Sequence, residues 1–131
     1  MDLAKVQAHL QRRLPQLMAI YLFGSQASGE AGARSDLDMA VLVQGSVDPL
    51  LLWELAGELA DIVHLSVDLL DLRRASTVMQ YQVVTTGRCL WSSGVDSALY
   101  EAFILSEKTN LDAARAGLLD DIYRDGVVHG R

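Results

Sequence analysis

Residues 24–43 read GSQASGEAGARSDLDMAVLV and carry the strongest structural signal in the chain. Gly24 and Ser25 open it, and after a polar interval Asp36 and Asp38 lead directly into an apolar run that ends at Val43. The run predicts a β-strand over about 37–43, in which alternate side chains share a face and the two aspartate Cα atoms lie about 6–7 Å apart. An Asp-x-Asp pattern alone is more often the end of a surface turn. Its coupling to Gly24 and Ser25 favours a pair of carboxylates that shares divalent cations.

A second strand is predicted before Gly24. Residues 18–23, MAIYLF, form an apolar run of strand length, which Gly24 and Ser25 interrupt. Gly24 leaves room for a ligand to approach the backbone, while Ser25 offers a hydroxyl at the start of a short helix whose free amides attract phosphate. We therefore expect one strand to present phosphate-binding groups and its neighbour to present the metal ligands.

These residues resemble the polymerase-beta-type nucleotidyltransferase superfamily, and residues 24–43 are similar to its minimal-nucleotidyltransferase (MNT) branch. The resemblance implies that Asp36 and Asp38 bind Mg²⁺, with two ions expected. It also implies that Gly24 and Ser25 hold the nucleotide triphosphate and that a later strand supplies a third carboxylate. MNT relatives often carry basic residues shortly after the Gly-Ser pair, where this chain has Gln26 and Ser28. Nucleotide affinity is then weaker here, unless Arg34 substitutes for them.

Two residues compete for the role of the third carboxylate. Asp68 lies within the strand-like run LSVDLL, residues 65–70, and Asp71 follows it. The two positions differ by three, so in a continuous strand their side chains face opposite sides. A carboxylate among apolar residues is costly to bury unless it is paired or binds a cation, which favours Asp68.

The composition fits one domain. At 131 residues, half of them hydrophobic, the chain is long enough to build a core. A formal net charge of −6 and a pI near 4.8 argue against direct nucleic-acid binding and favour a neutral or basic partner. Cys89 is the only cysteine, so an internal disulfide is excluded. We expect Cys89 to lie in a buried strand. Neither a signal sequence nor a membrane span is expected, so we predict a cytoplasmic protein.

The remaining pattern predicts strands and helices in alternation. Beyond the strands at 18–23 and 37–43, we expect helices over about 2–14, 48–63 and 74–86 and strands over 65–70 and 88–91, with a left-handed cap at Gly87 and His64 ending a helix. A helical segment over about 95–124 is expected to break near residues 109–110, with Val95, Leu99, Ala102 and Phe103 on one face. Trp53 and Trp91 are interpreted as core or interface residues. The fold class is α/β (α+β): a small mixed sheet flanked by helices, as one nucleotidyltransferase domain over residues 1–131.

The resemblance also implies a function. Stand-alone MNT proteins resemble antitoxins that adenylylate a tyrosine of a HEPN-family ribonuclease toxin, with ATP as the substrate. The expected catalytic and metal-binding residues are Asp36, Asp38 and Asp68. Family members that act on small molecules generally carry an additional substrate-binding domain, whereas only about forty residues follow the predicted sheet here, so we expect a protein acceptor. Two alternatives stay open: an antitoxin that neutralises its partner by binding alone, and a nucleotidyltransferase that modifies an aminoglycoside-type small molecule.

Overall fold

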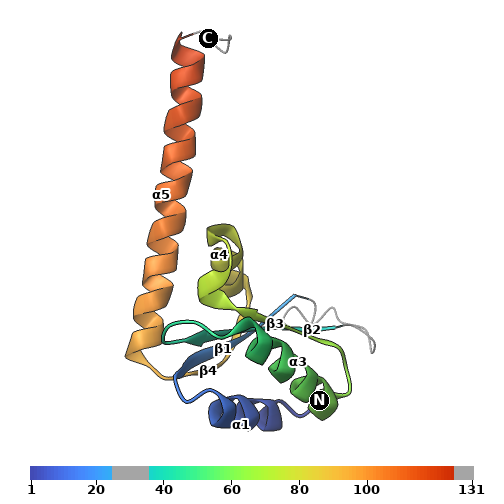
Figure 1. Ribbon diagram of the computed structural model, residues 1–131. Helices are drawn as coiled ribbons and strands as arrows, with labels where there is room; N and C mark the ends of the chain where they lie inside the picture. The colour runs from blue at the N-terminus through green and yellow to red at the C-terminus, as the bar shows by residue number, and fades with distance from the viewer. Residues whose placement is uncertain (25–35, 126–131) are drawn as a thin grey trace.

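The computed structural model describes residues 1–24 and 36–125, with side chains up to residue 117. Within these residues, four strands form one sheet in the order β3-β2-β1-β4 (Figure 1). β1 pairs antiparallel with both β2 and β4, whereas β2 and β3 run parallel. The expected mixed sheet flanked by helices is therefore confirmed. In chain order the elements are α1 (Leu3–Arg13), β1 (Leu17–Phe23), β2 (Leu37–Val43), α3 (Pro49–Val63), β3 (Val67–Asp71), the 3-10 helix η1 (Leu72–Arg74), α4 (Thr77–Thr86), β4 (Arg88–Ser92) and α5 (Val95–Asp125).

The bounds of α1 and α3 follow from local side-chain chemistry. The carboxylate of Asp2 accepts a hydrogen bond from the Lys5 amide at 3.1 Å, and that of Asp48 accepts one from the Leu50 amide at 2.8 Å. Both aspartates thereby satisfy amides that lack partners in the first turn of a helix. Pro49 occupies the start of α3, and His64 ends it in the left-handed conformation with φ 58°. The helices predicted over 2–14 and 48–63, and the role of His64, are confirmed.

The two faces of the sheet bury different sets of side chains. In β2, Leu37, Met39 and Val41 belong to the core that α1 and α3 cover, whereas Ala40 and Leu42 belong to a second core that includes Val83 of α4 and Ile104 of α5. Figure 1 shows α1 and α3 on one side of the sheet and α4 and the base of α5 on the other. Because side chains alternate along a strand, Asp36 and Asp38 belong to the face that carries α4 and α5.

Gly87 does not form the left-handed cap that the sequence predicted. Its φ is −77° and its backbone is extended. The requirement for glycine is steric: a Cβ atom at this position would lie 2.8 Å from the Leu22 carbonyl oxygen and would also overlap the Val83 carbonyl oxygen. Gly87 therefore lets the end of α4 pack directly against β1.

One other prediction about burial was wrong. Cys89 is exposed, because β4 is an edge strand of the sheet. Trp53 and Trp91 were predicted to be core or interface residues. Trp53 is 74% exposed on α3, so only the interface part of that prediction stays open for it, while Trp91 packs against the core as a partly buried side chain.

The C-terminal helix also differs from the prediction. α5 continues through residues 109–110 without a break. Thr109 donates its hydroxyl to the Leu105 carbonyl at 3.0 Å, and Lys108 pairs with Asp112 at 2.7 Å, so these polar side chains are satisfied within the helix. No helix in the described part of the chain is long and apolar enough to cross a membrane.

The buried face of α5 is not the one suggested by its apolar residues. Ser97 and Ile104 are buried, whereas Val95, Leu99 and Phe103 are 74%, 65% and 54% exposed. The packing is set by three anchors to the sheet and to η1. Ile104 enters the core, the Tyr21 hydroxyl donates to Glu101 at 2.8 Å, and the Arg73 guanidinium lies 4.4 Å from the centre of the Tyr100 ring.

Gly87→Ala should destabilise the protein by about 1–3 kcal/mol, because the new methyl group forces α4 away from β1. Gly57→Ala is the matched control: nothing lies within 4 Å of a Cβ there, and alanine favours the interior of α3, so a gain of roughly 0.5–1 kcal/mol is expected. Urea unfolding of both variants measures the difference. Equal stability of the two would contradict the steric role of Gly87.

Candidate active site

Three strand ends bring the predicted site residues together. Asp38 lies beside Asp68 in the parallel register of β2 and β3, and on its other side it pairs with Phe23 at the end of β1. Asp36 directly precedes β2 and is exposed, as is Asp68, while Asp38 is half-buried. Gly24 follows Phe23. The arrangement joins both members of the Asp-x-Asp pair, the third carboxylate favoured by the sequence and the glycine at one end of the sheet.

The carboxylates repel one another. The pKa of Asp38 is raised above its usual value, first by burial and then by the negative charges of Asp68 and Asp36. A divalent cation would relieve this repulsion, and carboxylate oxygens are the ligands that Mg²⁺ and Mn²⁺ prefer. The donor set therefore fits such a cation. Among the described residues, no three acidic, histidine or cysteine side chains already converge as a metal cage.

Gly24 is required by its position against Asp38. Its φ is +70°, a conformation that other residues rarely adopt. A Cβ atom on Gly24 would overlap the Oδ2 atom of Asp38 and lie 3.2 Å from its Cγ atom. A side chain at residue 24 would thus displace the central carboxylate. The other predicted phosphate ligand, Ser25, and the suggested substitute cation Arg34 lie outside the described residues.

Asp71, the other candidate for the third carboxylate, has a structural role. It is buried, and its two oxygens accept hydrogen bonds from the amides of Val47 at 2.9 Å and Arg73 at 3.2 Å. Its side chain faces the core of α1 and α3, on the opposite side of the sheet from Asp68, as the three-residue offset predicted. Asp71 holds the loop after β2 against η1 and is not available to a cation.

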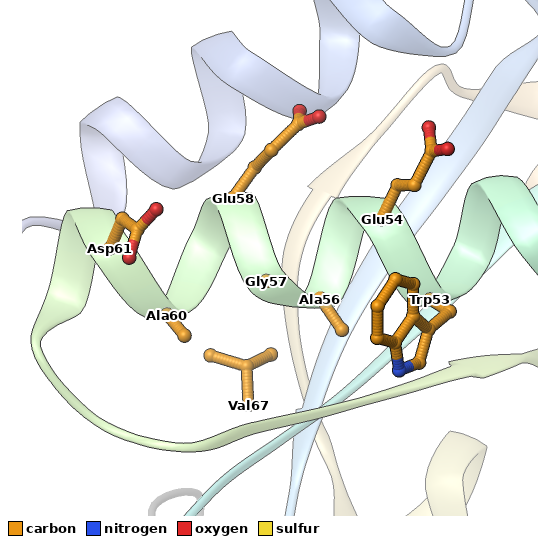
Figure 2. Close-up of a pocket in the computed structure, with 8 residues that line it drawn as sticks. All are labelled: Trp53, Glu54, Ala56, Gly57, Glu58, Ala60, Asp61 and Val67. Atoms are coloured by element: carbon orange, nitrogen blue, oxygen red, sulfur yellow. The ribbon is translucent and has the colours of Figure 1, made fainter.

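One cavity in the described part of the chain is remote from the carboxylates. It has a volume of about 560 Å³ and lies along α3 beside the start of β3. Figure 2 shows Ala56, Ala60 and Val67 facing one another, with the Trp53 indole at one end. Val67 faces the α1 and α3 side of the sheet, so this cavity and the carboxylates belong to different faces.

A smaller cavity adjoins the candidate site. It measures about 330 Å³ between the end of β1 and α4, and its lining residues are Phe23, Gly24, Met79, Gln82, Val83 and Thr86. Sequence reasoning identified only Gly24 among them. The α4 residues carry no motif, and only the helical spacing of positions 79, 82, 83 and 86 indicates that they share a face.

Asp68→Asn should stabilise the metal-free protein at pH 7. Because the folded-state pKa of Asp38 is raised, stability falls as the pH rises from the ordinary carboxyl value through the raised one, and removal of the Asp68 charge lessens this loss. Thermal unfolding in a chelator should show a higher Tm for the variant at pH 7 and no difference below about pH 3, where the carboxyl groups are protonated. The exposed Asp61→Asn on α3 controls for net charge. An equal gain from Asp61→Asn would contradict the local repulsion.

Asp71→Asn should have the opposite effect. An amide has one acceptor oxygen where the carboxylate has two, so one backbone donor is left without its partner and the NH₂ group faces it. We expect a loss of about 1–3 kcal/mol of stability in urea unfolding. Unchanged stability would contradict the structural role of Asp71.

Comparison with known proteins agrees with the geometry. Residues 4–95 match the family model described as "Polymerase beta, Nucleotidyltransferase". Protein adenylyltransferase MntA of Shewanella oneidensis is 42% identical over 118 residues, which cover 90% of this chain and 85% of that protein. A protein of the same name from Aphanizomenon flos-aquae is 25% identical over 132 residues, covering 92% of this chain and 88% of that protein.

Two solved structures extend the likeness to three dimensions. One, described as a toxin-antitoxin crystal structure with AMP-PNP, has a TM-score of 0.83 and 40% identity and covers 94% of this chain and 99% of its own. Another, described as a tri-AMPylated Shewanella oneidensis HEPN toxin in complex with MNT antitoxin, has a TM-score of 0.74 and 39% identity, covering 92% and 94%. The chain thus belongs to the polymerase-beta-type nucleotidyltransferase family.

Proposed function

We propose that this chain is a metal-dependent protein adenylyltransferase that acts as an antitoxin, transferring AMP from ATP to a tyrosine of a HEPN-family toxin. The observation that carries the proposal is the register of β2 and β3, which sets Asp38 beside Asp68 with Gly24 packed against Asp38. The substrate and partner follow from relatives whose names and complexes include adenylyltransferase activity, AMP-PNP and an AMPylated HEPN toxin.

Each residue has a distinct role in this proposal. Asp36, Asp38 and Asp68 hold the metal, with two Mg²⁺ ions expected, and Gly24 and Ser25 hold the triphosphate. The bound metal supplies charge neutralisation at the phosphates and a lower pKa for the acceptor hydroxyl. Asp68, an exposed carboxylate on the edge strand β3, accepts the proton of the tyrosine hydroxyl. The tyrosine oxygen then bonds to the α-phosphorus as the bond to the leaving pyrophosphate breaks, giving AMP-tyrosine and pyrophosphate.

A protein acceptor suits the site better than a small molecule. Asp36 and Asp68 are exposed at the rim of the sheet, where a tyrosine on a partner's surface can reach them. The net charge of −6 favours a basic or neutral partner. We place the reaction in the cytoplasm, where ATP and Mg²⁺ are available.

Asp36→Asn/Asp38→Asn should reduce AMP transfer at least about a hundredfold, because two ligands of the charge-neutralising metal are lost. The assay is intact-mass spectrometry of a co-expressed HEPN partner after incubation with ATP and Mg²⁺. Wild type should add mass in steps of one AMP. The matched control is Asp61→Asn, a change of the same chemistry on the far face of the sheet, which should transfer AMP at the wild-type rate.

Other outcomes identify the alternatives. Complex formation without added mass, together with protection of cells by the double variant, would establish neutralisation by binding. Nucleotidyl transfer to an aminoglycoside without any partner protein would establish a small-molecule enzyme.

A further inference from the structure

The cavity between β1 and α4 has the character of a ligand subsite. Its volume of about 330 Å³ is within the range of small-molecule pockets, which are mostly apolar with a few polar groups that fix orientation. Phe23, Met79 and Val83 supply apolar lining. The Thr86 hydroxyl donates to the Gln82 carbonyl at 2.6 Å and is already committed to the helix backbone. The side-chain amide of Gln82 is exposed and bonds to no other residue that the structure describes.

The cavity is connected to the candidate active site through Gly24. One side of Gly24 lines the cavity, while the position of its missing side chain is taken by the Asp38 carboxylate. A molecule that reaches from the carboxylates past Gly24 therefore enters this space. The Gly87 contact with β1 fixes α4 at the same end of the sheet, so the cavity is bounded by elements held against each other.

The chemistry of the lining selects between two possible occupants, a nucleobase and the aromatic ring of the acceptor tyrosine. Both are flat and suit the apolar lining that Phe23 and Met79 supply. An amide presents a donor and an acceptor side by side, and this pair matches the donor and acceptor on one edge of adenine. A phenol ring offers only one polar group, and that group must lie at the phosphates rather than in the cavity.

We propose that this cavity receives the adenine base of the nucleotide and that Gln82 is a specificity-determining residue that reads the edge of the base. The inference rests on the proposed nucleotidyl transfer and adds the part of the site that recognises the nucleoside. It assigns the triphosphate and the base to opposite sides of Gly24.

Calorimetric binding of three probes in the presence of Mg²⁺ tests the inference: AMP-PNP, GMP-PNP and inorganic tripolyphosphate. Gln82→Leu should weaken AMP-PNP binding about tenfold and reduce the preference for AMP-PNP over GMP-PNP, because the base loses its polar partner. Tripolyphosphate should bind as to the wild type, since it lacks a base. Gln11→Leu, the same change at an exposed position of α1 on the opposite face, should leave all three affinities unchanged.

A second variant tests the space rather than the polar group. Met79 is 36% exposed, so Met79→Trp can fill the cavity without disturbing the core. It should weaken AMP-PNP and GMP-PNP binding and leave tripolyphosphate binding unchanged.

The remaining results separate the inference from the function on which it rests. If wild type binds AMP-PNP and tripolyphosphate but Gln82→Leu and Met79→Trp leave both affinities unchanged, the base lies elsewhere and the inference is wrong. If AMP-PNP affinity is unchanged while transfer to the partner falls, the cavity holds the acceptor ring. If wild type binds neither probe, the proposed nucleotidyl transfer itself fails.

Discussion

The parallel register between β2 and β3 is the constraint on which the site depends. It sets Asp38 directly beside Asp68, so that negative charges gather at one end of the sheet. Burial first, and then the charges of Asp68 and Asp36, raise the pKa of Asp38. A shift of one residue would turn Asp68 toward the α1 and α3 core, where its charge would be buried without a partner. The apolar residues on either side of each aspartate prevent that shift, because Leu37, Met39, Val67 and Leu69 all bury on the other face. Burial of these apolar side chains thus holds the carboxylates close together even though their charges repel one another.

Much of the fold could be predicted because its signals are local. Asp48 and Pro49 specify where α3 begins, and the apolar runs that form β1 and β2 have the length and spacing of strands. Where a structural feature depends on long-range packing, the sequence was misleading. Gly87 is a glycine because β1 approaches it closely, and nothing near residue 87 in the sequence reports the Leu22 carbonyl. Cys89 is exposed because its strand is the last in the sheet, which the strand order decides.

The candidate site also contains residues that the sequence predicted and residues that it did not. The spacing of Asp36 and Asp38, and the three-residue offset between Asp68 and Asp71, were sufficient to predict which carboxylates share a face. The α4 contribution could not be predicted, because Met79 and Gln82 approach Gly24 only once α4 is packed on β1. The carboxylates could therefore be recognised from their spacing in the sequence, whereas the residues that line the adjoining cavity could not.

The first part of the long helix α5 is anchored in the core, whereas the outer part is exposed. Ile104 anchors the first part in the core, and Lys108 still reaches over the Tyr81 ring at 5.2 Å, but every residue from Asp112 to Gly117 is exposed. At about 1.5 Å per residue, α5 is roughly 46 Å long and extends well away from the sheet (Figure 1). Isolated helical turns are marginal in water, so the outer part has a local opening free energy that is independent of the global one. Its backbone amides should therefore exchange with solvent hydrogen through fraying, whereas those of β2 exchange only when the whole sheet opens.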